Sequence, residues 1–282
     1  MSSVASMAQA PILKIGLIAD IQYCNCESAG AREYTKSLVK LDEAVQVINQ
    51  EKADLTVEVG DMIDRDFASF DPVFKKLNNL TAKWIFVPGN HDFNVPDSLK
   101  KTVFKMIGSK KGYHAEVVKG IRLLYLNGFE NSVIAWSKET KDYKENKDRL
   151  KRLEKAKAKN ASDWNGGLGK KQLEWVKSEV EKANQLNQKL IVFGHQPIVP
   201  GEEHSLWDSK KLIEALAAFQ HQVLYICGHK HSGGDHTIGN TRIINLKGMV
   251  EQVSPSFGVL SIYPDGYELK GYGGEDYFKG KL

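Results

Sequence analysis

Five short apolar runs recur along the chain, and each leads through a glycine or another small residue to a polar side chain. Their length and their content of branched apolar residues are typical of buried strands. The runs are Ile12–Ala19, Leu55–Val59, Trp84–Val87, Leu190–Phe193 and Val223–Cys227. We therefore predict five strands whose carboxyl ends carry polar residues.

Segments with helical periodicity separate these runs. In Tyr34–Gln50, apolar residues recur at the spacing of one helix face. The same interpretation applies to Asp71–Leu80, Asp97–Ile107 and Lys170–Ala183. Alternating strands and helices predict a largely parallel sheet covered by helices, with ligands at the carboxyl ends of its strands. We therefore expect the five polar strand ends to converge on one edge of a sheet.

The last third of the chain has a different pattern. Short strands joined by turns are predicted at Asp235–Ile238, Thr241–Leu246, Phe257–Tyr263 and Tyr267–Tyr272, which suggests a second sheet packed on the first. Residues from about 138 to 170 begin with a stretch dense in Lys, Arg and Glu, which predicts a solvated helical insert near the site. With no linker visible, we predict a single domain over residues 11–282, preceded by a flexible N-terminus or signal remnant over residues 1–10.

Composition narrows the class of protein. The 282 residues are 41% hydrophobic and 26% charged, which is ordinary for a globular domain. The formal charge of +4 is spread along the chain, so we expect no nucleic-acid partner. No apolar run is long enough to span a bilayer, so we expect no membrane partner. Residues 1–10 lack the basic and apolar regions of an export signal, which favours a cytoplasmic protein; an exported or periplasmic protein is the alternative if they are a trimmed signal.

The three cysteines are few and odd in number, which argues against a disulfide scaffold. Cys24 and Cys26 flank Asn25 and could bind a soft metal, but a zinc site needs further partners at suitable spacing. We therefore interpret them as two loop cysteines. Cys227 lies in an apolar run and is expected to be a small core residue.

The polar residues at the strand ends are carboxylates, amides and imidazoles. In chain order they are Asp20-Ile21-Gln22, Gly60-Asp61-Met62-Ile63-Asp64, Gly89-Asn90-His91-Asp92, Gly194-His195 and Gly228-His229-Lys230-His231. Hydrolysis of a phosphate ester near neutral pH needs an activated water and relief of charge on the phosphoryl oxygens, and two divalent cations supply both. One such motif alone is a common turn, but five in this order predict a two-metal phosphoesterase.

The ordered set resembles the calcineurin-like metallophosphoesterase superfamily from Asp20 to His231. The resemblance implies an α/β fold, a four-layer αββα sandwich with two central mixed sheets flanked by helices. It implies that Asp61 bridges two metals. The first metal would be held by Asp20, Gln22, Asp61 and His231, and the second would be completed by Asn90, His195 and His229.

The resemblance also implies residues that act on the substrate. His91 would protonate or stabilise the leaving oxygen. Asp64 would contact the residues around the metals without binding a metal itself, and Asp92 is a candidate partner for His91. Arg32 is a candidate phosphate clamp because its planar guanidinium matches phosphate oxygens. His204 could line the pocket, and a surface position is the alternative for both Arg32 and His204.

Gln22 stands where most members of the superfamily have histidine. This departure, together with Arg32–Leu38 and Asn165–Trp175, resembles the branch of manganese-dependent ADP-ribose/CDP-alcohol diphosphatases. The branch implies two divalent metal ions, with Mn preferred over Fe, Zn or Mg. It also implies small nucleoside diphosphate substrates, such as ADP-ribose and CDP-choline, cleaved at the phosphoanhydride bond.

Two alternatives stay open from the sequence. The first is a phosphomonoesterase or a cyclic-nucleotide phosphodiesterase on the same fold, because fold and metals do not decide the substrate. The second is a non-catalytic binding scaffold, which would be expected to have lost ligands. The sequence does not determine the oligomeric state.

Overall fold

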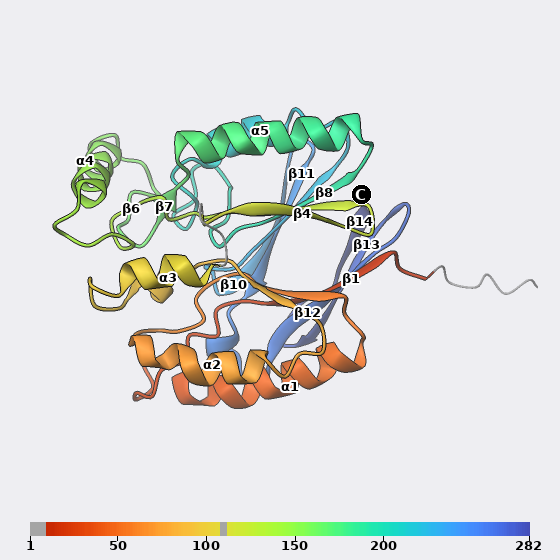
Figure 1. The fold of residues 1–282 in the computed structure, drawn as a ribbon, viewed down its shortest axis with the longest axis horizontal. Helices are drawn as coiled ribbons and strands as arrows, with labels where there is room; N and C mark the ends of the chain where they lie inside the picture. The colour runs from red at the N-terminus through yellow and green to blue at the C-terminus, as the bar shows by residue number, and fades with distance from the viewer. Residues whose placement is uncertain (1–9, 108–111) are drawn as a thin grey trace, which may run out of the picture.

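The computed structural model describes residues 10–107 and 112–282, and it consists mainly of two six-stranded sheets with helices outside them (Figure 1). The first sheet has the order β14 (Phe278–Lys281), β13 (Gly266–Gly273), β12 (Ser256–Ile262), β1 (Leu13–Ile18), β2 (Leu55–Glu58) and β3 (Trp84–Phe86). The second has the order β10 (Ser232–Ile238), β11 (Thr241–Lys247), β9 (Val223–Cys227), β8 (Lys189–Phe193), β5 (Ile121–Tyr125) and β4 (His114–Val118). Both sheets are mixed, because β12 pairs antiparallel with β1 and β10 pairs antiparallel with β11.

The helices lie on the two outer faces. The first sheet is covered by α1 (Ser37–Gln50) and α2 (Phe70–Leu77), and the second by α5 (Lys170–Gln185), as Figure 1 shows. The helix α6 (Ser209–Leu216) also packs on the second sheet. Along β9, Leu224 and Ile226 belong to the core between the sheets, whereas Val223 and Tyr225 pack with α5 and α6. This alternation is the period of two expected for a strand buried on both faces. The predicted four-layer αββα sandwich is therefore confirmed.

The expectation that the last third forms a sheet of its own is wrong. Its strands are divided: β10 and β11 extend the second sheet, whereas β12, β13 and β14 extend the first. The five strand ends also come from two sheets instead of one, three from the first and two from the second. Local patterns identify a strand, but the partner of a strand is set by long-range hydrogen bonding that the patterns do not contain.

Among the described residues, the helix α6 and the strands β4, β5 and β14 were not predicted, and neither were the two-residue strands β6 (Asn131–Ser132) and β7 (Gly166–Gly167). The run Ile121–Tyr125 is fully apolar apart from Arg122, but it does not end at a ligand-type residue and was not recognised. The α3 helix (Lys100–Met106) was predicted, and α4 (Lys141–Lys155) falls in the predicted insert. The short pairing of β6 with β7 lies next to α4.

Residues 1–9, which make up almost all of the predicted flexible terminus, lie outside the described residues. Among the residues that are described, the structure contains no helix with the length and apolar character needed to cross a membrane.

Candidate metal centre

Four of the predicted ligands have left-handed backbone conformations. The φ angle is 52° at Asp20, 42° at Gln22, 62° at Asp61 and 71° at His229. Such angles cost a non-glycine residue about 1–3 kcal/mol each and are found where surrounding structure holds them, often at functional sites. Backbone hydrogen bonds from Asp20 N to Gly60 O (3.0 Å) and from Gln22 N to Asp61 O (2.8 Å) join the ends of β1 and β2 in this geometry.

Two glycines allow the ligand loops to approach each other. Gly60 has a φ of +105°, and a Cβ there would lie 2.3 Å from Nδ1 of His195. A Cβ at Gly89 would lie 2.1 Å from Oδ1 of Asp61. No side chain fits at these separations, so the Gly-Asp and Gly-Asn motifs are a requirement of close packing at the centre.

The ligand-type side chains gather into two groups that share Asp61. One group is Asp61, His195 and His229, and the other is Asp20, Asp61 and His231. In each group the candidate ligand atoms lie within 4.8 Å of one another, and every member is buried. The shared carboxylate is the arrangement that a residue bridging two cations requires.

Asn90 completes the group of Asp61, His195 and His229, which corresponds to the second metal. Nδ1 of His195 lies 2.8 Å from the carbonyl of Val59, which only accepts, so Nδ1 donates and the neutral ring has its lone pair on Nε2. That Nε2 lies 3.1 Å from Oδ1 of Asn90 and 3.1 Å from Nδ1 of His229. When the His195 ring is neutral, lone pairs that converge at such distances repel one another, and either a proton on Nε2 or a bound cation relieves the repulsion. The donor set therefore fits a divalent metal.

Gln22 fits the group of Asp20, Asp61 and His231, which corresponds to the first metal. Its Nε2 lies 3.1 Å from Oδ2 of Asp61 and 3.0 Å from Nε2 of His231. Its Oε1 is buried without a hydrogen-bond partner among the described residues. Rotation of the amide by half a turn exchanges the two atoms, and it would direct Oε1 toward a cation held by Asp61 and His231.

The electrostatics of the centre are those of a site that holds either protons or cations. Burial lowers the pKa of His195, but the Asp61 carboxylate outweighs it and raises the pKa to about 9. Burial also opposes protonation of His231, and Asp20 with Glu251 raises its pKa to about 10. Burial and the neighbouring His195 hold the pKa of His229 well below its usual range.

These shifts predict that cation binding releases protons. Near neutral pH and without metal, His195 and His231 each carry an extra proton, which a cation must displace, so affinity should rise with pH. Calorimetric titration with Mn²⁺ between about pH 6.5 and 8.5, in buffers of different ionisation enthalpy, measures the number released. A Mn²⁺ affinity that does not change with pH, with no protons released on binding, would contradict the prediction.

His91 is held by Asp64. Its Nδ1 lies 3.0 Å from the carbonyl oxygen and 3.2 Å from Oδ1 of Asp64, and Nε of Arg65 donates to Oδ2 of the same carboxylate at 2.6 Å. Burial lowers the pKa of His91, but Asp61 and Asp64 outweigh it and raise the pKa above the usual value. The ring can therefore hold a proton near neutral pH and give it up to a leaving oxygen.

The prediction that Asp92 is the partner of His91 is wrong. Asp92 is fully buried in a 3-10 turn, η3 (His91–Phe93), and its carboxylate accepts from the backbone N–H groups of Gly89 (2.7 Å), Asp61 (3.0 Å) and Met62 (2.9 Å). Neighbouring residues of such a turn point in different directions. Asp92 thus ties together the loops that carry Asp61 and Asn90, and Asp64 contacts His91.

The centre opens into a cavity of about 320 Å³. Both candidate substrate contacts, Arg32 and His204, line it, so a position elsewhere on the surface is excluded for them. Trp164, which was not predicted, also lines the cavity, and its ring centroid lies 5.1 Å from that of His204 and 5.2 Å from that of His229. The only sequence signal for Trp164 is its position directly before the Asn165–Trp175 stretch.

Glu251 is a second residue that sequence reasoning missed. Its Oε1 lies 2.9 Å from Nδ1 of His231 and 3.1 Å from Nε of Arg32. The contact fixes which nitrogen of His231 faces Asp20 and Gln22, and it holds Arg32 beside the cavity. Because Glu251 follows no strand end with a ligand motif, no local pattern identified it.

Cys24 and Cys26 lie in a loop, as interpreted, and they are joined by a disulfide that was not predicted. Their Cα atoms lie 5.3 Å apart, which is within the range that a disulfide spans. The pair packs with Tyr34 and Val250. Cys227 is a buried free cysteine, as predicted.

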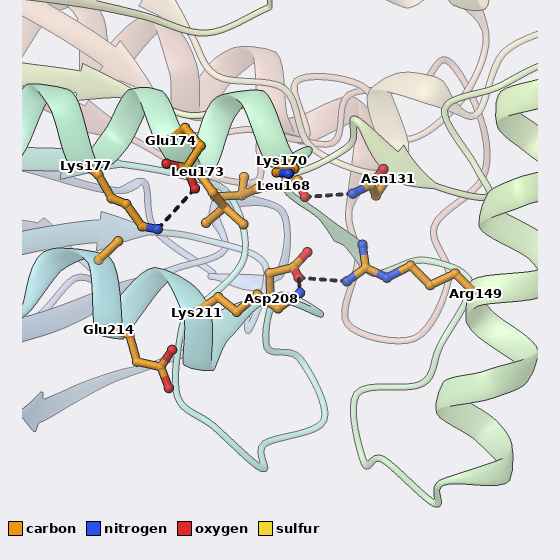
Figure 2. A pocket seen from close by; sticks show the side chains of 11 residues that line it. Asn131, Arg149, Leu168, Lys170, Leu173, Glu174, Lys177, Asp208, Lys211 and Glu214 are labelled. Atoms are coloured by element: carbon orange, nitrogen blue, oxygen red, sulfur yellow. Dashed lines mark hydrogen bonds and ion pairs between the residues drawn. The ribbon is translucent and has the colours of Figure 1, made fainter.

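A larger cavity, of about 640 Å³, lies between α5, α6 and Arg149 of α4 (Figure 2). None of the predicted site residues lines it. Its charged side chains largely pair with one another: Arg149 contacts Asp208 at 2.8 Å, and Lys177 contacts Glu174 at 3.1 Å (Figure 2). The ligand-type residues therefore gather only at the smaller cavity, as far as the described residues are concerned.

Comparisons with known proteins agree with this geometry. Two relatives named manganese-dependent ADP-ribose/CDP-alcohol diphosphatase, from Arabidopsis thaliana and Mus musculus, are 25% and 26% identical to the chain. The matches cover 95% and 94% of this chain and 96% and 92% of those proteins. A crystal structure of a dimetal phosphatase from Danio rerio has the same fold, with a TM-score of 0.87 at 22% identity, and covers 96% of this chain and 99% of that one.

Residues 13–233, more than half of the chain, match the calcineurin-like phosphoesterase family. This range contains all seven candidate ligands and ends just after His231. With two groups of ligand atoms meeting at a shared buried carboxylate, the chain belongs to the calcineurin-like phosphoesterase family and is a metal-dependent phosphohydrolase.

Proposed function

We propose that the protein hydrolyses the phosphoanhydride bond of small nucleoside diphosphate compounds such as ADP-ribose and CDP-choline, and that it prefers manganese. One observation carries the proposal: two groups of candidate metal ligands that share Asp61 lie against a small cavity that is also lined by a guanidinium and aromatic rings. The relatives' names, which specify manganese, ADP-ribose and CDP-alcohols, support this choice of substrate and metal.

The residues that would hold the first cation are Asp20, Gln22, Asp61 and His231, and those that would hold the second are Asp61, Asn90, His195 and His229. Bound divalent cations supply an activated water and neutralise charge on the phosphoryl oxygens. His91, oriented by Asp64, holds a proton for the oxygen that leaves with its phosphate or alcohol group.

The cavity lining suits a nucleotide. Arg32 offers guanidinium N–H groups, which match phosphate oxygens, and Glu251 holds its position. Trp164 and His204 offer ring faces on which a nucleobase can stack. A cavity of about 320 Å³ is at the small end of ligand pockets, which favours a small molecule over a polymer.

A substrate panel tests the proposal. ADP-ribose, CDP-choline, a cyclic nucleotide and p-nitrophenyl phosphate are each assayed with Mn, Mg, Zn and Fe. We expect the highest kcat/KM on the two diphosphate compounds with Mn. A higher value on p-nitrophenyl phosphate or on the cyclic nucleotide would reject the diphosphatase in favour of the corresponding enzyme. Absence of turnover throughout, with metal bound, would indicate a binding scaffold.

Gln22 should set the metal preference. An amide oxygen suits Mn and Mg, whereas imidazole suits Zn and Fe, so Gln22→His should lose part of the Mn advantage and hold Zn or Fe more tightly. Turnover and bound metal are measured with each ion in turn. The control is Gln22→Glu, which keeps an oxygen ligand and should keep the preference for Mn. If the metal profile of Gln22→His coincides with that of the wild type, Gln22 is not a ligand.

A further inference from the structure

Asn165 contacts a predicted metal ligand although it belongs to none of the metal motifs. It is fully buried at the start of the Asn165–Trp175 stretch, just before β7. Its Oδ1 lies 3.1 Å from Nε2 of His229. Its Nδ2 donates to the carbonyls of Asn160 at 3.1 Å and Glu203 at 2.7 Å.

These contacts fix the orientation of the amide. The carbonyls of Asn160 and Glu203 only accept hydrogen bonds, so the NH₂ group must face them and Oδ1 must face His229. An amide oxygen only accepts, so Nε2 of His229 must be the protonated nitrogen. In the neutral ring Nδ1 then carries the lone pair, and it lies 3.1 Å from Nε2 of His195.

The other two histidines of the centre are held in the opposite sense. His195 uses Nδ1 to reach the carbonyl of Val59, and His231 uses Nδ1 to reach Glu251, so both present Nε2 to the ligand groups. His229 alone among the three must present Nδ1. Its ring therefore needs a separate acceptor on the Nε2 side, and Asn165 is that acceptor.

We propose that Asn165 is a positioning residue that holds the His229 ring with Nε2 protonated and Nδ1 directed at the second cation. The amide also links His229 to two separate segments, one after α4 at Asn160 and one beside His204 at Glu203. Asparagine suits the position because it accepts on one side and donates twice on the other, which neither aspartate nor leucine does. The inference rests on the proposed function only in placing a cation beside His229.

The test uses the 282-residue chain and three variants. Asn165→Ala removes the acceptor. Asn165→Asp keeps an acceptor oxygen but turns a second oxygen toward two carbonyls. Asn240→Ala is the matched control, because it removes hydrogen bonds from an asparagine amide to the carbonyls of Leu216, Phe219 and His221 and contacts neither Asn165 nor His229.

Two measurements are made on each protein. The first is NMR of the metal-free, ¹⁵N-histidine-labelled protein, in which a buried, hydrogen-bonded Nε2–H of His229 gives a slowly exchanging resonance. The second is calorimetric titration with Mn²⁺ alone. We expect Asn165→Ala to lose the resonance and to bind one of two Mn²⁺ ions about 10–100-fold more weakly, the usual effect of losing the partner of a ligating histidine.

Asn165→Asp should keep the resonance while lowering the thermal unfolding temperature, and Asn240→Ala should lower that temperature with Mn²⁺ affinity unchanged. The proposal is overturned if Asn165→Ala keeps both the resonance and the Mn²⁺ affinity, or if Asn240→Ala weakens Mn²⁺ binding equally. If Asn165→Ala does not fold, loss of the resonance in Asn165→Asp overturns it. Neither readout needs turnover, so failure of the substrate panel would reject the proposed substrates and leave this inference standing.

Discussion

Asp61→Asn is expected to abolish turnover while the fold is retained. Asp61 is the residue shared by both ligand groups, so the substitution removes a negative charge from both cation sites at once. We expect a loss of at least about 10²–10³-fold in kcat, the size seen when a preorganised charge-stabilising group is removed. The measurements are kcat on the best substrate of the panel and the number of bound metal ions per chain.

The fold should survive for two reasons. Asparagine tolerates left-handed backbone better than most residues, and the φ at position 61 is 62°. Its amide oxygen can still accept the hydrogen bond that His91 N donates to Oδ1 at 2.8 Å. Asp66→Asn is the matched control, because Asp66 has a φ of 65° but is exposed and outside both groups. An Asp61→Asn protein with two bound metals and wild-type turnover would show that Asp61 does not bridge.

His91→Ala should slow the reaction in proportion to how poor the leaving group is. Proton donation contributes typically about 10²–10⁴-fold where a strongly basic oxygen departs. The phosphate released from a diphosphate needs less help, because its second pKa is near about 6. We therefore expect a larger loss of kcat on a phosphodiester with an alkyl leaving group than on CDP-choline.

The contacts of His91 allow a sharper version of this experiment. Asp64→Asn keeps the shape of the residue that holds Nδ1 of His91 but removes the charge that helps raise the pKa of the ring. This variant should show the same ordering of substrates with smaller losses, and His221→Ala, at an exposed position outside the centre, should show none. Equal losses on both substrates in His91→Ala would leave His91 with a role in positioning only.

Much of the fold was accessible from local pattern. The strands that carry ligands and the helices of Tyr34–Gln50 and Lys170–Ala183 were predicted because apolar periodicity and turn residues are encoded over short distances. Some strands without a ligand at their end were missed, and Ile121–Tyr125 is one of them. The division of strands between two sheets was also missed, since pairing joins segments far apart in the chain, as when β1 pairs with β12.

The sequence alone determined which residues could bind metal. Each motif that carries candidate ligands follows an apolar run, and the structure brings all seven ligands together. Which residues contact and orient the histidines of the centre was decided only by tertiary structure. Glu251 reaches His231, Asn165 reaches His229, and Asp64 rather than Asp92 reaches His91.

The physical reason is the same in each of these cases. A side chain's type and its place at a strand end are local properties, which a sequence displays. The direction in which it points depends on backbone turns such as η3, and its hydrogen-bond partner can be far away in sequence, as the separation of 64 residues between Asn165 and His229 illustrates. The chemistry of the centre could therefore be predicted from the sequence. The contacts that orient its histidines were set by the packing of the two sheets and their loops.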